Sequence, residues 1–136
     1  MNDYLLGAFG AHPDHDAHIL STLSAIQILV THNAMDQMDI ARVVKCRSHH
    51  HPSINRLTSW LLDILSLQQP SGVFAGDSFG ETDTRFLYCA VNALSLLGHL
   101  ADLDIEKTVS YIRQCKNFDG GFGATIGAES HAAQGW

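Results

Sequence analysis

Cysteine, proline and tryptophan are scarce in this chain of 136 residues, which holds three cysteines, three prolines and two tryptophans. The cysteines are odd in number and widely spaced, so neither a disulfide framework nor a CxxC metal clip is predicted. We expect Cys46, Cys89 and Cys115 to be buried free thiols. Charged residues make up 16% of the chain and hydrophobic residues 46%, which is typical of one ordinary globular domain.

Basic residues are also few. Eight lysines and arginines stand against 14 acidic residues, and the net charge of -6 argues against binding to nucleic acid. Lys107, Arg113 and Lys116 are expected to form one solvated helix face. No apolar run approaches the roughly 20 residues of a membrane span. The start "MNDYLLGAFG" also lacks the basic residues of a secretory signal, so we expect a cytoplasmic protein.

Glycine-rich loops recur along the chain. The stretches "SGVFAGDSFGETD" and "DGGFGATIGAESH" align without a gap at a period of about 48 residues, pairing Phe74 with Phe122 and Asp83 with His131. A fainter copy starts with "GAF" at Gly7 and lies further than one such period before the second copy. We expect the two phenylalanines to pack between repeats.

Each repeat is predicted to contain a glycine loop, a helix, a short turn and a second helix. Gly98 is expected to end one helix, while Asp39 and Asp104 are expected to cap others, as are Glu81 and Glu129. Apolar residues recur at helical spacing after the first two loops: Ile19, Leu23, Ile26 and Val30, then Phe86, Ala90, Val91, Leu94 and Leu97. Tandem helix pairs of this kind predict an all-α stack of about five helices.

The first repeat is longer than the second. The helix-start phrases "DIARVV" and "DIEKTV" are separated by the same number of residues as the first and second glycine loops. This separation is longer than the one between the second and third loops. The excess fits best at 47–63, a stretch with a histidine triplet and Trp60. We predict that this segment is not part of the repeat. The simplest hypothesis is that 47–63 are encoded by an unspliced intron that was translated in frame. A similar error in reading the gene would have added Gly135 and Trp136. The alternative is a natural surface insertion between repeats. The apolar residues of the segment 47–63 could still extend the helix that ends near Leu67.

The histidines do not predict a metal site. His49 to His51 cannot all face one ion from a regular helix or strand, so we expect an exposed loop there. His12, His15 and His18 lack an evident further ligand and are expected to be polar residues of a loop and a helix start. These histidines therefore predict no metal ligand, and no residue of this chain is assigned a catalytic role.

Three long phrases carry a family resemblance: "HDAHILSTLSAIQIL", "FAGDSFGETDTRFLYCAVNALSLLG" and "NFDGGFGATIGAESHAAQ". The chain resembles the N-terminal part of a protein prenyltransferase β subunit. It is most similar to the type II geranylgeranyltransferase that modifies Rab proteins, because Ala132, Ala133 and Gln134 follow His131 where the sister enzymes typically have two glycines. A type I β subunit is an alternative. The family fold is an (α/α)6 barrel, so residues 1–136 are expected to form an incomplete arc of such a toroid.

The resemblance implies a role for His131. It corresponds to the family histidine that contacts the isoprenoid diphosphate, and Ala132 and Ala133 are expected to share that site. A histidine at a helix start would add an N–H donor to unpaired backbone N–H groups and to the positive end of the helix dipole. Such donors also favour a departing diphosphate as negative charge builds up on it.

Arg85 and Tyr88 correspond to family residues that line the isoprenoid pocket. A purely structural interpretation stays open for both. In that interpretation a carboxylate such as Asp83 holds Arg85, and Tyr88 is an aromatic residue of the core.

The resemblance also implies a reaction, a cofactor and partners. The family enzyme transfers geranylgeranyl from geranylgeranyl diphosphate to C-terminal cysteines of Rab proteins, and a zinc ion binds the acceptor thiolate. Its zinc ligands lie in later repeats, so this chain is expected to lack them and to be inactive alone. The implied partners are a prenyltransferase α subunit and a Rab protein bound to an escort protein. A non-catalytic helical-repeat module that retains partner or isoprenoid binding is the second interpretation.

Overall fold

The structure, a computed structural model, describes residues 8–35 and 56–134, with side chains of the second range from residue 60 onward. The described residues form helices and isolated β-bridges and contain no strand of a sheet. The all-α prediction is therefore confirmed, while the cap predicted at Asp39 lies outside the described residues. The helices are α1 (Ile19–Thr31), α3 (Arg56–Ser66), α4 (Thr84–Leu96) and α5 (Ile105–Gln114), with 3₁₀ turns η2 (Leu100–Asp102) and η3 (Ala132–Gln134).

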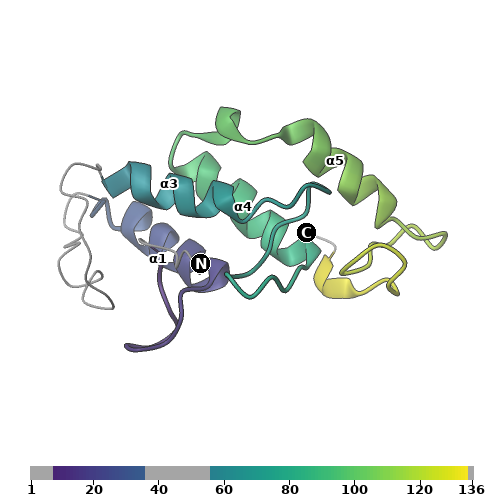
Figure 1. Ribbon diagram of the computed structural model, residues 1–136, viewed down its shortest axis with the longest axis horizontal. Helices are drawn as coiled ribbons and strands as arrows, with labels where there is room; N and C mark the ends of the chain where they lie inside the picture. Colours follow the sequence, from purple (N-terminus) through teal and green to yellow (C-terminus); the bar gives the residue numbers. More distant parts are fainter. Residues whose placement is uncertain (1–7, 36–55, 135–136) are drawn as a thin grey trace.

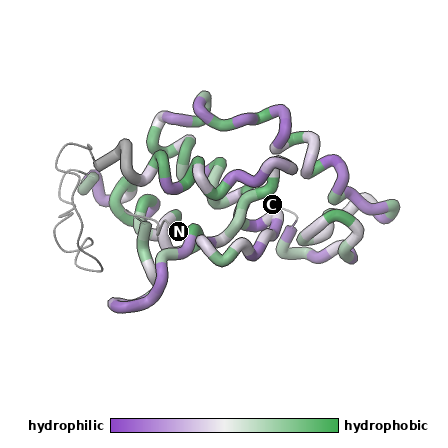
Figure 2. The backbone as a smooth tube through the Cα atoms, viewed as in Figure 1, coloured by the Kyte–Doolittle hydropathy of each residue, from purple (hydrophilic) through white to green (hydrophobic). Residues whose placement is uncertain are grey.

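Helix α4 is the centre of the core. It contacts both α1 and α3, and Figure 1 shows these three helices side by side, with α5 beyond them. The hydropathy colouring of Figure 2 runs mostly green along α4. Small residues in this helix allow its neighbours to approach closely, because alanine adds little volume at a helix contact. The buried residues of α4 are Phe86, Leu87, Cys89, Ala90, Ala93 and Leu94.

Side-chain caps define where the helices begin. Asp83 Oδ1 accepts a hydrogen bond from the Arg85 N–H at 2.7 Å, and Asp104 Oδ1 accepts one from the Lys107 N–H at 3.2 Å. The cap at Asp83 stabilises α4 by about 1 kcal/mol. The prediction for Asp104 is confirmed. The prediction for Glu81 is wrong, because Asp83, two residues later, holds the position from which a side chain reaches the first free N–H groups of α4.

The end of α4 follows the prediction. Gly98 has a φ of +76°, the left-handed conformation that closes many helices and that glycine adopts without a Cβ penalty. The backbone N–H of His99 then bonds to Leu94 O at 2.8 Å, which satisfies a carbonyl of the last turn. The helix stop predicted at Gly98 is confirmed.

The glycine loops have the same geometry in three copies. Each contains a β-bridge between residues seven positions apart, and the bridges begin at residues 10, 75 and 123. These positions have the same offsets as the three loops aligned from sequence, so the structure agrees with the predicted repeat register. Phe74 of the second loop is fully buried and packs as predicted, whereas Phe122 of the third is half-buried.

Consecutive repeats are joined by one recurring backbone hydrogen bond. The first N–H of α1, from Ile19, donates to Gly76 O in the next loop at 2.8 Å. The first N–H of α4, from Thr84, donates to Ala124 O in the loop after that at 2.9 Å. A helix N–H that has no partner within its own helix therefore holds the following repeat in place.

Residues from the predicted insertion 47–63 contribute to the core. Residues 47–55, including His49 to His51, lie outside the described residues, whereas 56–63 form most of helix α3. Trp60 and Ile64 of this helix are 4% and 2% exposed, and the Trp60 ring meets Phe9 edge-on at 5.9 Å. The predicted helix, which ends near Leu67, is confirmed. The exclusion of 47–63 from the repeat stays a prediction.

Both described cysteines are free thiols in the core. Cys89 and Cys115 are buried, as predicted, and Cys46 lies outside the described residues. Burial raises the pKa of the Cys89 thiol to about 11, so this group stays protonated near neutral pH.

The two outer helices expose apolar side chains, as expected of an arc. Leu20 and Ile28 of α1 are 45% and 60% exposed, and Ile105 and Val109 of α5 are also exposed. The basic residues near α5, Lys107, Arg113 and Lys116, face solvent as predicted. Across the described ranges, no helix combines the length and hydropathy that crossing a membrane requires.

The first prediction compares two equivalent glycines. Gly72→Ala should lower the free energy of unfolding by roughly 2–5 kcal/mol, because the left-handed backbone is unfavourable and a Cβ would also lie 2.3 Å from Lys107 O. Gly120 has a similar φ but nothing within 4 Å of its Cβ position among the described residues, so Gly120→Ala should cost only roughly 1–2 kcal/mol. Urea denaturation measures both. Equal losses would contradict the close contact of Gly72 with α5.

The second prediction concerns residues 47–63. If they derive from an unspliced intron, sequencing of the mature transcript should find messages in which Cys46 is followed directly by Ile64. A message that keeps codons 47–63 in every copy would refute the hypothesis and establish a natural insertion.

Candidate functional site

The predicted site residues gather where two repeats meet. Asp83 and Arg85 lie at the start of α4, and His131 directly precedes η3. Asp83 and His131 belong to consecutive repeats. Because η3 contacts α4, both residues lie at the same edge of the arc, which we call the rim. Figure 1 shows this rim where the last part of the chain, in yellow, meets the beginning of α4.

His131 caps its own turn through its ring. Nδ1 accepts a hydrogen bond from the Ala133 N–H at 3.1 Å, so His131 holds the cap position predicted for Glu129. The backbone oxygen of His131 accepts a bond from the Gln134 N–H at 2.9 Å, and the imidazole is exposed. Because Nδ1 is an acceptor here, the neutral ring carries its proton on Nε2. Nε2 has no hydrogen-bond partner within residues 8–35 and 56–134, so it is available to donate to a ligand.

The backbone after His131 forms η3, a 3₁₀ turn that reaches the last described residue. The Ala133 N–H is bound by the His131 ring, and Nε2 of that ring is a donor that the turn offers to an anion.

Arg85 is held by Asp83. Its Nε and Nη2 atoms donate to Asp83 Oδ2 at 3.0 and 2.7 Å, and the Asp83 side chain is only 7% exposed. Burial would raise the pKa of Asp83, but the hydrogen bonds and charge of Arg85 outweigh it and lower the pKa below its ordinary value. The predicted contact of Arg85 with Asp83 is confirmed, and 47% of the Arg85 side chain remains exposed.

Tyr88 is not a core residue. It is 40% exposed, and its phenol oxygen accepts a hydrogen bond from Asn92 Nδ2 at 3.1 Å. Tyr88 lies three residues after Arg85, so the two side chains share one face of α4. The core interpretation of Tyr88 is wrong, because 40% of the residue is exposed.

Sequence reasoning missed Gln134 and Thr84 as parts of this rim. The Gln134 side chain reaches back to the preceding repeat, where it contacts Thr84 and Asp83. One signal was available: Gln134 lies one repeat period after Phe86, a core residue at the start of α4. Equivalence to a residue buried at one repeat contact predicts a similar contact for its counterpart.

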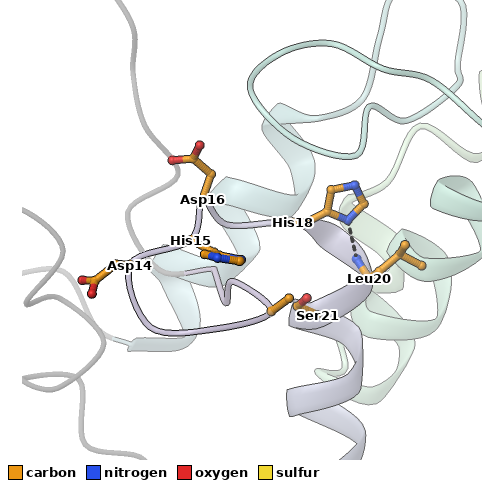
Figure 3. Close-up of a pocket in the computed structure, with 7 residues that line it drawn as sticks. Asp14, His15, Asp16, His18, Leu20 and Ser21 are labelled. Atoms are coloured by element: carbon orange, nitrogen blue, oxygen red, sulfur yellow. Dashed lines mark hydrogen bonds between the residues drawn. The ribbon is translucent and has the colours of Figure 1, made fainter.

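The histidines at the other end of the arc form no metal centre. His18 caps α1, with its Nδ1 accepting from the Leu20 N–H at 3.2 Å, as the dashed line in Figure 3 shows. His15 lies beside an open hollow of about 550 Å³, and Figure 3 shows the carboxylates of Asp14 and Asp16 pointing away from each other. Within the described ranges there is no group of three or more potential metal ligands. The predicted roles of His15 and His18 in a loop and at a helix start are confirmed.

The pKa of Asp83 leads to the third prediction. Because its folded value lies below the ordinary 3.8, ionised Asp83 contributes stability above that pH, and the contribution is lost as the pH falls through the folded pKa. Asp83→Asn should therefore destabilise the chain by roughly 1–2 kcal/mol at pH 6 and by less at pH 3. Urea unfolding at both pH values tests this, with Asp16→Asn in an exposed loop as the control. A loss that does not depend on pH would contradict it.

The sequence is similar to known proteins over nearly its whole length. A family model described as the prenyltransferase alpha-alpha toroid domain matches residues 3–136. The β subunit of geranylgeranyl transferase type-2 from Saccharomyces cerevisiae is 48% identical over 128 residues, and that from Candida albicans is 47% identical. The type-1 β subunit from Arabidopsis thaliana is 42% identical, but over 54% of this chain.

The two type-2 alignments cover 94% of this chain but only 35% and 36% of the relatives, so the chain spans about a third of their length. The helix pairs, their glycine loops and the absence of strands from the described residues agree with the matched domain. On the family match and this geometry together, the chain belongs to the prenyltransferase alpha-alpha toroid family.

Proposed function

We propose that this chain is part of the β subunit of a type-2 geranylgeranyl transferase, which joins geranylgeranyl from its diphosphate to C-terminal cysteines of Rab proteins. One observation carries the proposal: identity to type-2 β subunits extends over 94% of the chain. Type-1 identity covers 54%, and a farnesyltransferase β subunit from Schizosaccharomyces pombe is only 29% identical. The type-1 alternative is therefore less well supported.

His131 is the proposed contact to the isoprenoid diphosphate. In the transfer, the cysteine sulfur forms a bond to the first carbon of the isoprenoid while the bond from that carbon to the diphosphate oxygen breaks. Negative charge builds up on the departing diphosphate, and a preoriented N–H donor stabilises it. The proton on Nε2 of the exposed His131 ring suits this task. Ala132 and Ala133 contribute by giving the turn its shape, since the Ala133 N–H is already bound to the ring.

Arg85 and Tyr88 are the proposed wall of the isoprenoid pocket. Both present exposed surface on one face of α4. The charge of Arg85 is balanced by Asp83, so its methylene stem can lie along an apolar chain while the guanidinium stays paired. The Tyr88 ring offers a further apolar surface.

A zinc ion is proposed for the whole enzyme, where it would bind the acceptor cysteine as a thiolate. The described residues do not fit such a site, because they contain no group of three potential ligands. Its ligands are therefore expected in the part of the relatives that this chain does not match. The proposed partners are a prenyltransferase α subunit and a Rab protein with its escort protein, in the cytoplasm.

The fourth prediction tests the function by grafting. This chain would replace the segment that it matches in the Saccharomyces cerevisiae type-2 β subunit, and the chimera would be assayed with its α subunit. We expect geranylgeranyl transfer, and we expect His131→Ala in the chimera to lower kcat/KM by roughly 30- to 1000-fold, equal to about 2–4 kcal/mol of transition-state stabilisation. His99→Ala, at a partly exposed histidine beyond the C-terminal end of α4 that pairs with Asp102, is the control.

The outcomes separate the hypotheses. Full transfer by the His131→Ala chimera would remove the proposed role of the imidazole. A chimera that binds geranylgeranyl diphosphate but transfers nothing would favour the non-catalytic repeat module instead.

A further inference from the structure

The two joints between repeats use equivalent positions with different chemistry. At the first joint, the N-cap His18 packs its ring edge-on against Phe86 of the next repeat, with ring centroids 5.1 Å apart. At the second, the N-cap Asp83 accepts a hydrogen bond from Gln134 Nε2 at 3.4 Å. His18 and Asp83 hold equivalent positions in their repeats, as do Phe86 and Gln134, so both pairs follow the repeat register. An apolar contact at one joint is replaced by a polar one at the other.

The amide of Gln134 bridges two groups of the preceding repeat. Its Oε1 accepts from the Thr84 hydroxyl at 2.6 Å, while its Nε2 faces Asp83 Oδ1. The orientation of the amide is determined by Asp83, because an ionised carboxylate accepts hydrogen bonds and cannot donate them. Asp83 and Thr84 are the last residue before α4 and its first residue, so the amide is anchored to a rigid helix end.

The backbone of Gln134 holds the same turn as His131. The Gln134 N–H donates to His131 O, and one residue earlier the Ala133 N–H donates to His131 Nδ1. The Gln134 side chain thus connects the start of α4 to the turn that orients the imidazole. If the side chain were released, the turn would lose its anchor, and the hydrogen bond at Nδ1 would be free to open.

We propose that Gln134 is a positioning residue for His131, acting through Thr84 and Asp83 of the preceding repeat. Together these residues orient the imidazole and hold its proton on Nε2, the form that donates to a diphosphate. The binding of a diphosphate by His131 rests on the proposed function, whereas the orientation of the ring by Gln134 does not. The side chain of one repeat thereby orients a ligand-binding group through the helix end of another.

The test uses the 136-residue chain, with the nitrogen NMR shifts of the His131 ring as the readout of its tautomer. We expect the wild type to show mainly the form protonated on Nε2. Gln134→Ala and Thr84→Val should both shift the ring toward a mixture of forms, whereas Thr84→Ser keeps the hydroxyl and should behave as the wild type. Gln27→Ala, at an exposed glutamine of α1, is the matched control. Because the Thr84 hydroxyl also faces Gly123 O at 3.1 Å, a shift in Thr84→Val without a shift in Gln134→Ala would overturn the inference.

A titration with geranylgeranyl diphosphate separates this inference from the proposed function. Gln134→Ala and Thr84→Val should weaken binding about three- to tenfold, in line with the loss of one orienting hydrogen bond. If His131→Ala leaves the affinity unchanged, the diphosphate role fails, while the ring shifts still decide the positioning role. Ring shifts in Gln134→Ala and Thr84→Val equal to the wild type would overturn the inference. Should Gln134→Ala fail to fold, identical ring shifts in Thr84→Val and Thr84→Ser would overturn it.

Discussion

The hydrogen bond from the first N–H of a core helix to a carbonyl of the next glycine loop is the constraint on which this structure depends. It joins Ile19 to Gly76 and Thr84 to Ala124 at nearly the same length. An N–H in the first turn has no carbonyl partner within its own helix, and leaving it buried and unpaired would cost about 1–3 kcal/mol. The bond therefore fixes where each repeat sits on its neighbour. It also requires the loop backbone to approach the helix end closely, since a Cβ at Gly76 would lie 2.5 Å from the His18 ring.

Because this joint recurs, the residue just before each helix or turn comes to the same rim of the arc. His18, Asp83 and His131 occupy that equivalent position, and each accepts a hydrogen bond from the N–H two residues later. Their surroundings separate them. The His18 ring packs against the next repeat, Asp83 is buried and holds Arg85, and His131 is exposed. The same repeat position therefore provides a packing contact at His18, an ion pair at Asp83 and an exposed N–H donor at His131.

Predictions from local pattern succeeded where short-range chemistry decides the outcome. Asp104 and Gly98 were recognised because a cap and a left-handed helix end depend on residues only a few positions away. The cap predicted at Glu81 failed by two residues, since a pattern does not determine which acid faces the free N–H groups. The sequence leaves Tyr88 open between the isoprenoid pocket and the core for a similar reason. Apolar spacing marks the buried face of a helix, but its edges depend on the neighbours that pack there.

The sequence by itself determined the helices, the repeat register and the equivalence of Asp83 with His131, because these follow from local periodicity and internal repetition. Only the tertiary structure decided which side chains at the rim bond to one another. The bonds from Gln134 to Thr84 and Asp83 span 50 and 51 residues, and the repeat register indicates a contact with the preceding repeat but not which groups bond. The state of the His131 ring likewise depends on the fold, because a hydrogen bond from Ala133 selects which ring nitrogen carries the proton.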